Sequence, residues 1–431
     1  MENNLPENVK KYLKKFSFRN VNIFPKTDNK YDLITVIPAI DEFENIKILI
    51  DSFEKNKTSF TNKILILFVI NNSDSANEKV KKENLKTIRY LKELINQQKT
   101  KFRYSFIDLS STGNTLPEKI AGVGLARKIG MDAALLFFDY TSFEKKILLC
   151  CDADCTVATN YFDEVYKNFN NKKLTAAYVK YFHPINLEDK NSDAIINYEI
   201  FLRYYVLGLK YSHSAFAIHT IGSTMACDFE HYIKIQGMNK RKAAEDFYFM
   251  EKLAKITEVK EIKTTEIYPS NRGSWRVPFG TGQRVNRFIS KERDEYLLYS
   301  PESFEILKKW NNYFFNLTEE SEKKIESDIK KISASLFLFL EKNNFFSDWK
   351  NIISNSKQNI QLRKQKNFWF DGFKTLKLIH YLRDTSFPQV PMFEALDVLF
   401  FKCGIKTIER KEKIPALEIQ FEYLKTLREN T

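Results

Sequence analysis

The stretch that decides the fold is KILLCCDADCTVATNYF, residues Lys146–Phe162. It begins with a run of aliphatic and thiol residues, Ile147–Cys151, and then changes abruptly to two carboxylates, Asp152 and Asp154. An apolar run of this length, bounded by polar residues, is typical of a strand buried on both faces of a sheet. The carboxyl ends of such strands are the places where open α/β sheets bind ligands.

Two carboxylates one residue apart repel each other unless a positive group lies between or beside them. A hard divalent cation that carries a phosphate ester would fill this role, because carboxylate oxygens suit Mg²⁺ and Mn²⁺. A plainer explanation is a solvated Asx turn that caps the strand, or an N-cap for a helix expected near Tyr161. The pattern alone does not decide between these explanations.

Composition and length describe a globular protein. At 431 residues, with 43% apolar and 29% charged residues, the chain can bury a sizeable core and form more than one domain. No run reaches the roughly 18 apolar residues of a transmembrane helix, since the nearest candidate, Ile195–Leu209, is interrupted by Glu199 and Arg203. No secretory signal is recognisable, and five cysteines without a C-x-x-C pair favour neither zinc nor a disulfide framework. We therefore expect a cytoplasmic protein, or one at the inner face of the membrane.

The formal net charge of +13 has two explanations. Lysine pairs such as Lys10-Lys11 and Lys14-Lys15 lie among polar residues, as on a solvated helix face. No zinc finger, RRM signature or bZIP heptad is present, so we expect no nucleic-acid partner. A solvated lysine-rich surface is the first explanation, and contact with anionic lipid headgroups or phosphorylated substrates is the second.

Short apolar strands alternate with helices along the first 150 residues. This alternation predicts βαβ units and an α/β fold with a mainly parallel central sheet and helices on both faces. The later chain carries helical apolar spacing and few glycines, which predicts a helical C-terminal domain. The expected domains are an N-terminal helical and basic extension at 1–30, an α/β domain at 31–285 and a helical domain at 286–431. The expected elements are strands at 33–37 (ended by Pro38), 64–70, 102–109 and 147–151, and helices at 77–96, 121–138, from 318, at 329–340, 373–382 and 391–401.

Five motifs besides the opening stretch follow one another along the chain. They are VIPAIDE (36–42), VINNSDS (69–75), GVGLARKIGMDAAL (122–135), GSTMACDFEHYIKIQGMN (222–239) and AAEDFYFMEKL (243–253). In order and approximate spacing they resemble family 2 glycosyltransferases with the GT-A fold, over roughly residues 31–270. Each motif alone is weak, and the resemblance rests on their order.

The resemblance implies a Rossmann-like GT-A domain and an enzyme of the hexosyltransferase type. Its donor would be a nucleotide sugar, with a UDP-sugar expected first, and its acceptor a hydroxyl of a sugar or glycan. It also implies an inverting reaction with Mn²⁺ or Mg²⁺. Asp154 would bind the metal directly, while Asp152 would contact the ribose or a metal-bound water. By analogy Asp246 would be the general base and Glu245 the second choice, whereas the structural alternative is the acidic first turn of a helix over 247–256.

Other residues are expected at the donor by the same resemblance. Pro38 and Glu42 would lie near the base or ribose. Asn71 and Asn72 occupy the place where the family usually has an acidic residue that contacts the base, which puts the nucleoside in doubt. Arg127, which follows Gly122 and Gly124 in the sequence, would point towards the phosphates, although a tight loop-to-helix junction explains the glycines equally well.

The segment YPSNRGSWRVPFGTGQRV, residues 268–285, predicts a long ordered loop. Its arginines, Arg272, Arg276 and Arg284, could clamp a diphosphate or an anionic acceptor, and Trp275 could stack on a sugar or base. Alternatively the segment is an interdomain linker. The family often has a histidine here that completes the metal site, and this segment contains none, so that ligand is missing or replaced.

Two other functions stay open. A sugar nucleotidyltransferase should carry a glycine-rich loop directly after the first strand, and Val36–Asp41 contains no glycine. A non-catalytic nucleotide-sugar-binding protein on a degenerate scaffold is favoured by Asn71-Asn72. Retention of both acidic pairs, Asp152 with Asp154 and Glu245 with Asp246, argues against it. The aromatic residues of the C-terminal part, among them Trp310, Phe314 and Trp349, are expected to form core and not a carbohydrate platform.

Overall fold

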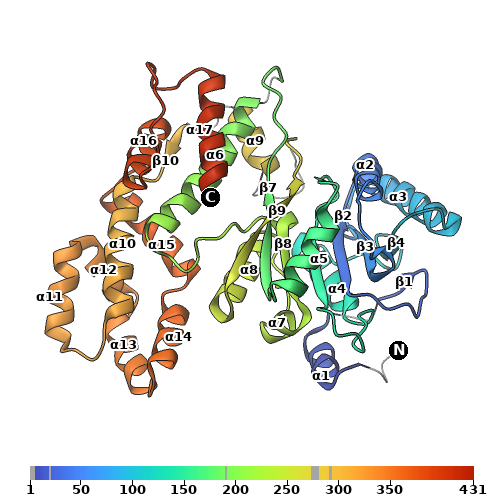
Figure 1. Ribbon diagram of the computed structural model, residues 1–431, viewed down its shortest axis with the longest axis horizontal. Helices are drawn as coiled ribbons and strands as arrows, with labels where there is room; N and C mark the ends of the chain where they lie inside the picture. Colours follow the sequence, from blue (N-terminus) through green and yellow to red (C-terminus); the bar gives the residue numbers. More distant parts are fainter. Residues whose placement is uncertain (1–4, 19–20, 190–191, 273–280, 291–293) are drawn as a thin grey trace. The chain divides into compact units, whose positions relative to one another are not determined.

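The computed structural model describes residues 5–18, 21–189, 192–272, 281–290 and 294–431. The chain divides into two compact units, which Figure 1 colours along the sequence. The first comprises the residues up to Pro184 together with His219–Asn271, and the second comprises Ile185–Ile218 and the chain from residue 281 on. The segment Ile185–Ile218 therefore belongs to the second unit, although the first unit resumes after it. The expected domain limits at residues 30 and 285 stay a prediction.

The first unit is built around one large sheet. Its strands are β1 (Ile23–Phe24), β2 (Leu33–Ala39), β3 (Ile64–Asn71), β4 (Arg103–Leu109), β5 (Ile147–Cys150), β6 (Thr156–Val157), β7 (Ala176–Tyr181), β8 (Met225–Asp228) and β9 (Val259–Tyr268). The order is β1-β4-β3-β2-β5-β8-β7-β9-β6. The strands β2, β3, β4, β5, β7 and β9 run in one direction, while β8 and the two-residue strands β1 and β6 are reversed. The sheet is therefore mainly parallel, as expected.

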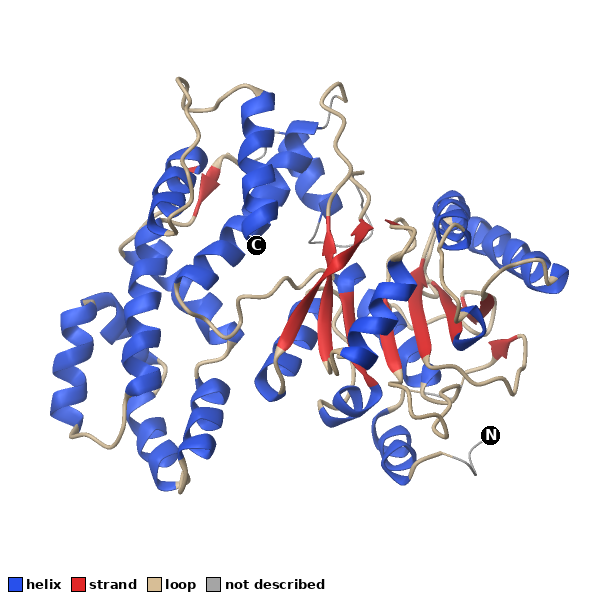
Figure 2. Cartoon of the chain, in the orientation of Figure 1, coloured by secondary structure: helices blue, strands red, loops and turns tan. Residues whose placement is uncertain are grey.

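Helices cover both faces of this sheet (Figure 2). The helices of the first unit are α1 (Glu7–Phe16), α2 (Phe43–Glu54), α3 (Glu78–Gln97), α4 (Val123–Ala134), α5 (Tyr161–Asn171), α7 (Phe229–Lys234) and α8 (Glu245–Ile256). Side chains of α2, α3 and α5 share a buried core with Ile37 of β2 and Phe68 of β3. Gly130 of α4 lies against Val36 and Val69, which point to the opposite face because successive strand residues alternate. The expected α/β class with helices on both faces is confirmed.

Pro38 does not end its strand, contrary to expectation. It pairs with Val69 inside β2, which continues to Ala39. The carbonyl of Val36 points towards β5, where it accepts a bond from the amide of Cys151 at 3.2 Å. The backbone nitrogen of Pro38, two residues further along, faces the same side. The last β5 residue paired with β2 is Cys150, opposite Val36. The missing amide hydrogen of Pro38 therefore removes no ladder bond, so the proline is tolerated inside the strand.

The second unit is helical, as expected for the C-terminal part. Its helices are α6 (Ser192–Tyr211), α9 (Thr281–Ser290), α10 (Pro301–Asn316), α11 (Glu322–Ile332), α12 (Ala334–Lys342), α13 (Phe345–Ser354), α14 (Asn359–Trp369), α15 (Gly372–Thr385), α16 (Met392–Lys402) and α17 (Leu417–Asn430); two short strands, β10 (Leu297–Leu298) and β11 (Val390–Pro391), pair with each other. Trp310, Phe314 and Trp349 lie in its apolar core, which confirms that these aromatic side chains are structural. The helix expected at 329–340 is interrupted at Ser333, whose side chain caps α12 by accepting from the Leu336 amide, and the preceding helix begins at Glu322 instead of Thr318.

None of the helices within the described ranges is long and apolar enough to cross a membrane. The sequence candidate, α6, instead carries a buried ion pair in which Arg203 donates to Glu199 at 2.7 Å. Arg428 of α17 binds the same carboxylate at 2.7 Å. The charges that interrupt the apolar run thus serve to join α6 to α17.

Candidate active site

The carboxyl ends of β2, β3 and β5 meet at one edge of the sheet because the three strands are parallel neighbours. Asp152 and Asp154 lie in the turn directly after β5, and both side chains are half-buried. The bond from the Cys151 amide to Val36 keeps the start of this turn attached to β2. Both carboxylates therefore lie at the edge where open α/β sheets bind ligands.

Arg127, in the first turns of α4, is the centre of the site. Its side chain is only 3% exposed. One guanidinium nitrogen, Nη2, donates to Oδ1 of Asp152, and the other, Nη1, donates to Oε1 of Glu245. A single buried cation thus joins the turn after β5 to the first residue of α8, which are far apart in the sequence.

Two glycines allow these groups to come together. A Cβ atom on Gly222 would lie 2.4 Å from Nη2 of Arg127, so the guanidinium fits only against a residue without a side chain. A Cβ atom on Gly124 would lie 2.3 Å from the carbonyl oxygen of Arg241 and 2.9 Å from Cβ of Glu245. Gly124 is therefore explained by the close approach of the chain that leads into α8, which is the plainer of the two explanations that the sequence left open.

The two carboxylates at the start of α8 hold protons more tightly than in water. Burial raises the pKa of Glu245 to about 7, while Arg127 opposes this shift and Asp246 adds to it. Burial also raises the pKa of Asp246, again against the attraction of Arg127. Burial alone would lower the pKa of Arg127, but Asp152 and Glu245 outweigh it and raise that pKa, so the arginine stays charged. Carboxylates of raised pKa suit proton transfer near neutral pH.

Asn71 and Asn72 are engaged in holding the strand ends. Their exposed fractions are 5% and 1%. The side-chain amide of Asn71 donates to the carbonyl of Ala39 at 3.2 Å, which fastens the end of β3 to the end of β2. Asn72 accepts a bond from the side chain of Asn84 at 2.8 Å. These bonds give both asparagines a structural use, and their contact with a nucleotide stays a prediction.

Pro38 and Glu42 lie close to the same edge. Pro38 is buried near the end of β2, and Glu42 directly precedes α2. The Glu42 carboxylate is 5% exposed and accepts a bond from Asn45 at 2.5 Å. Their expected contact with the base or ribose is likewise not tested by the structure.

The arginines of the 268–285 segment are not all placed at this edge. Arg276 and Trp275 lie outside the described residues. Arg284 belongs to the second unit, where it pairs with Glu295 at 2.6 Å. Arg284 is therefore engaged by a carboxylate of its own unit, which gives it a structural use.

A divalent cation would find two aspartates in the turn after β5. Within the described ranges, no group of three or more histidine, cysteine or acidic side chains is arranged to hold a metal. Magnesium, however, is commonly bound through one or two protein carboxylates together with substrate phosphates and water. Asp154 and Asp152 fit that kind of site, although Asp152 already shares a bond with Arg127.

The sequence did not identify the pairing of Arg127 with Glu245, nor Gly222 and Asn239 as supporting residues. Asn239 donates to the backbone carbonyl of Glu245 at 2.8 Å and so fixes the start of α8. The available signal was that Gly222 and Asn239 both lie in a motif already singled out, residues 222–239.

Cys150, Cys151 and Cys155, which surround the aspartates, are buried free thiols, and burial raises the pKa of Cys150 to about 12.

No family model and no curated protein sequence matches the chain. Among solved structures it is similar to residues 1–349 of TarS from S. aureus in complex with UDP-GlcNAc, at 11% identity and a TM-score of 0.38 over 92% of this chain and 90% of that one. It is also similar to the mannosyltransferase PcManGT from Pyrobaculum calidifontis in complex with GDP-Man and Mn²⁺, at 12% identity and a TM-score of 0.37 over 88% and 92% of the two chains.

Proposed function

We propose that the chain is a glycosyltransferase that moves a sugar from a nucleotide-sugar donor to a hydroxyl acceptor, with inversion and with a divalent cation. The observation that carries this proposal is the buried Arg127, which joins the Asp152 turn to Glu245 at the carboxyl edge of the sheet. A diphosphate leaving group needs positive charge and an acceptor hydroxyl needs a base. We assign to Asp154 the binding of the cation that supplies this positive charge, and to Asp246 the role of the base. Each lies within two residues of a carboxylate that Arg127 binds.

Asp154, with Asp152, would hold Mn²⁺ or Mg²⁺. When bound, the cation would supply positive charge that stabilises the departing diphosphate. The phosphates and water can complete its coordination, so a third protein ligand is not required. Arg127 would fix the position of Asp152 and thereby the shape of the turn.

Asp246 is the base in this proposal. The Glu245 carboxylate is bound to Arg127 and 4% exposed, whereas Asp246 is half-buried. The acceptor oxygen attacks the anomeric carbon while the bond from that carbon to the donor phosphate oxygen breaks. The acceptor proton passes to Asp246, and the nucleoside diphosphate leaves with the bonding electrons.

A thermal-shift screen tests the donor and the cation together. UDP-, GDP-, dTDP- and CMP-sugars are added to the protein with and without Mn²⁺, and we expect a UDP-sugar to raise the Tm most when Mn²⁺ is present. Asp154→Asn should lose the cation-dependent part of this shift. Asp51→Asn is the matched control, because Asp51 lies on the exposed side of α2. Equal cation-dependent shifts in Asp154→Asn and wild type would remove Asp154 from the proposed metal site.

Product analysis separates the alternatives. Release of nucleoside diphosphate in the presence of glycan acceptors, with an inverted anomeric centre by NMR, is expected. Binding without turnover for every acceptor indicates a non-catalytic nucleotide-sugar-binding protein. Formation of pyrophosphate from a sugar phosphate and a nucleoside triphosphate indicates a nucleotidyltransferase. A product that retains the anomeric configuration contradicts the assigned mechanism.

A further inference from the structure

The first helix, α1, has two chemically different sides. Val9 and Tyr12 are buried against the first unit. The other side carries four lysines whose spacing along the helix places them on one face. These residues, which we call the α1 lysine face, are Lys10, Lys11, Lys14 and Lys15.

A buried polar cluster fixes the apolar side of α1. The hydroxyl groups of Tyr12 and Tyr232 each donate to the same oxygen of Asp132, both at 2.7 Å. Lys128 pairs with the other oxygen of Asp132 at 3.0 Å. Gly237 has a φ of +72°, and a Cβ atom there would lie 1.9 Å from the Tyr12 hydroxyl. The helix is therefore held beside α7 (Figure 1). On its other side Lys11, Lys14 and Lys15 are exposed and Lys10 is half-buried.

Little negative charge accompanies these lysines. Glu7 lies on the same side, 3.9 Å from Lys11, and both side chains are largely exposed. In the described parts of the chain, no carboxylate pairs with Lys10, Lys14 or Lys15. Lys240 adds a further positive charge nearby, because its Nζ lies 5.2 Å from the ring of Phe18, just after α1.

We infer that the α1 lysine face docks on an anionic lipid surface, by charge and without insertion. Insertion would need the apolar side of the helix, and Val9 and Tyr12 are already buried in the protein. The face contains lysines and no arginine, so it offers mobile point charges instead of the planar forks that suit fixed phosphates in nucleic acids. A fluid surface of lipid headgroups demands no fixed geometry. This docking does not depend on the proposed transferase activity.

Vesicle sedimentation tests the inference on the whole chain. We expect binding to vesicles of phosphatidylcholine mixed with phosphatidylserine and none to phosphatidylcholine alone. Binding should disappear at about 1 M salt, where the Debye length falls to about 3 Å. Replacing Lys10, Lys14 and Lys15 with Gln should weaken it by roughly a hundredfold, since each lysine near such a surface contributes about fivefold.

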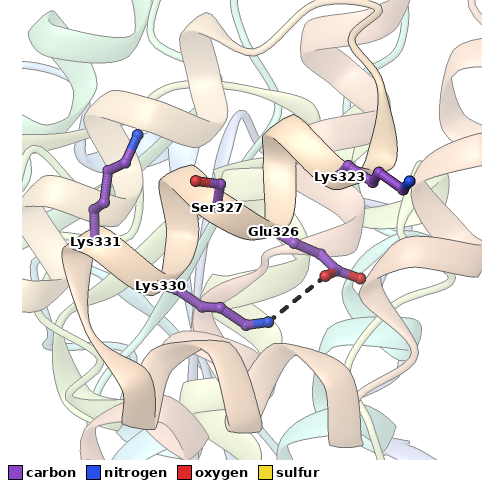
Figure 3. A pocket seen from close by; sticks show the side chains of 5 residues that line it. All are labelled: Lys323, Glu326, Ser327, Lys330 and Lys331. Carbon is purple, nitrogen blue, oxygen red and sulfur yellow. Dashed lines mark ion pairs between the residues drawn. The ribbon is translucent and has the colours of Figure 1, made fainter.

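The matched control makes the same change of charge on α11. Lys323, Lys330 and Lys331 line an open hollow of about 570 Å³ together with Glu326 and Ser327 (Figure 3). Lys330 pairs with Glu326 at 3.6 Å and Lys331 with Asp328 at 3.0 Å, so their charges are partly neutralised. Replacing these three lysines with Gln should leave vesicle binding within about twofold of wild type, because two of the three charges are paired with carboxylates and attract an anionic surface only weakly.

Three results would overturn the inference. The first is no binding to phosphatidylserine vesicles at low salt. The second is an equal loss of binding in the α1 and α11 variants, which would show that net charge alone is responsible. The third is tighter binding to an RNA or DNA oligomer through the same α1 lysines, which would assign the face to nucleic acid. Equal Tm values for both variants and wild type confirm that folding is unchanged.

Discussion

A buried arginine that holds two carboxylates changes the chemistry of both. Asp152 and Glu245 each receive a bond from Arg127, and Glu245 is almost fully enclosed. Asp246, one residue further, accepts instead from the backbone amide of Phe247 at 2.7 Å. Glu245 and Asp246 are adjacent acids in the sequence, and the fold places them in different environments. The two predictions at this scale use that difference.

Asp246→Asn keeps the shape of the side chain and removes its basicity. We expect the turnover rate to fall by about two to four orders of magnitude, because general-base catalysis is lost. Donor affinity should be nearly unchanged. Glu245→Gln should cost less activity, since in our proposal Glu245 positions Arg127 and the start of α8. Steady-state kinetics with a nucleotide-sugar donor measure both variants, and the reverse order of effects would make Glu245 the base.

Glu245 should also make stability depend on pH. Its pKa rises from 4.5 to about 7 on folding, so between these values the folded protein keeps a proton that the unfolded chain has lost. Stability must then fall as the pH rises through this window, by at most about 3–4 kcal/mol. Glu245→Gln cannot titrate, so the Tm of wild type relative to this variant should fall from about pH 4 to about pH 8. A difference that is constant, or that grows in favour of wild type, contradicts the raised pKa.

At the scale of elements, α4 is pressed closely onto the sheet. A Cβ atom on Gly130 would lie 2.4 Å from Cγ1 of Val36 and 2.7 Å from Cγ2 of Val69. We expect Gly130→Ala to lower the free energy of unfolding by about 1–3 kcal/mol, the usual cost of overfilling a packed core. Urea denaturation measures this change.

Val36→Ala removes one of the two opposing methyl groups. The double variant Gly130→Ala/Val36→Ala should therefore be more stable than the sum of the two single changes predicts. Strict additivity would mean that α4 moves away from the sheet instead of meeting Val36.

The strands and helices of the first unit were largely predictable from local pattern. The strands β3 and β5 lie within one residue of expectation, because continuous apolar runs bounded by polar residues mark buried parallel strands. The break at Ser333 was missed, since apolar spacing continues across it and only the capping bond ends the run. The pairing of Arg127 with Glu245 could not be predicted, because it depends on how α4 and α8 are brought together by the sheet.

At the scale of the whole molecule, the second unit is assembled from two separate stretches of chain. The helix α6 precedes the last part of the first unit in sequence, yet its Ile200 and Tyr204 lie in the core of the second unit. Its buried Glu199 depends on Arg428 of α17. From the sequence, the helical domain was expected only after residue 285. The helix α6 was not assigned to it, because its length and apolar content also suit a helix that covers a sheet.

A fragment that ends at residue 285 should therefore fold poorly. It would expose the apolar side of α6 and leave Glu199 without Arg428, and exposed apolar surface of this kind promotes aggregation. Replacing residues 186–217 of this fragment with a short glycine-serine linker should restore a soluble monomer. Size-exclusion chromatography compares the two fragments. A monomeric and cooperatively unfolding first fragment would show that α6 does not need the second unit.

Pro38 has a consequence for what can enter the sheet. Beyond Val36, β2 continues for three residues after its pairing with β5 has ended. A backbone amide at position 38 would give this unpaired edge of β2 a hydrogen-bond donor. The chain after Cys150 could then extend its pairing with β2. Proline withholds that donor, so the two strands stay parted where they diverge. The absence of this one hydrogen atom therefore limits the β2–β5 ladder to the residues before Pro38 and leaves the two aspartates that follow β5 outside the sheet.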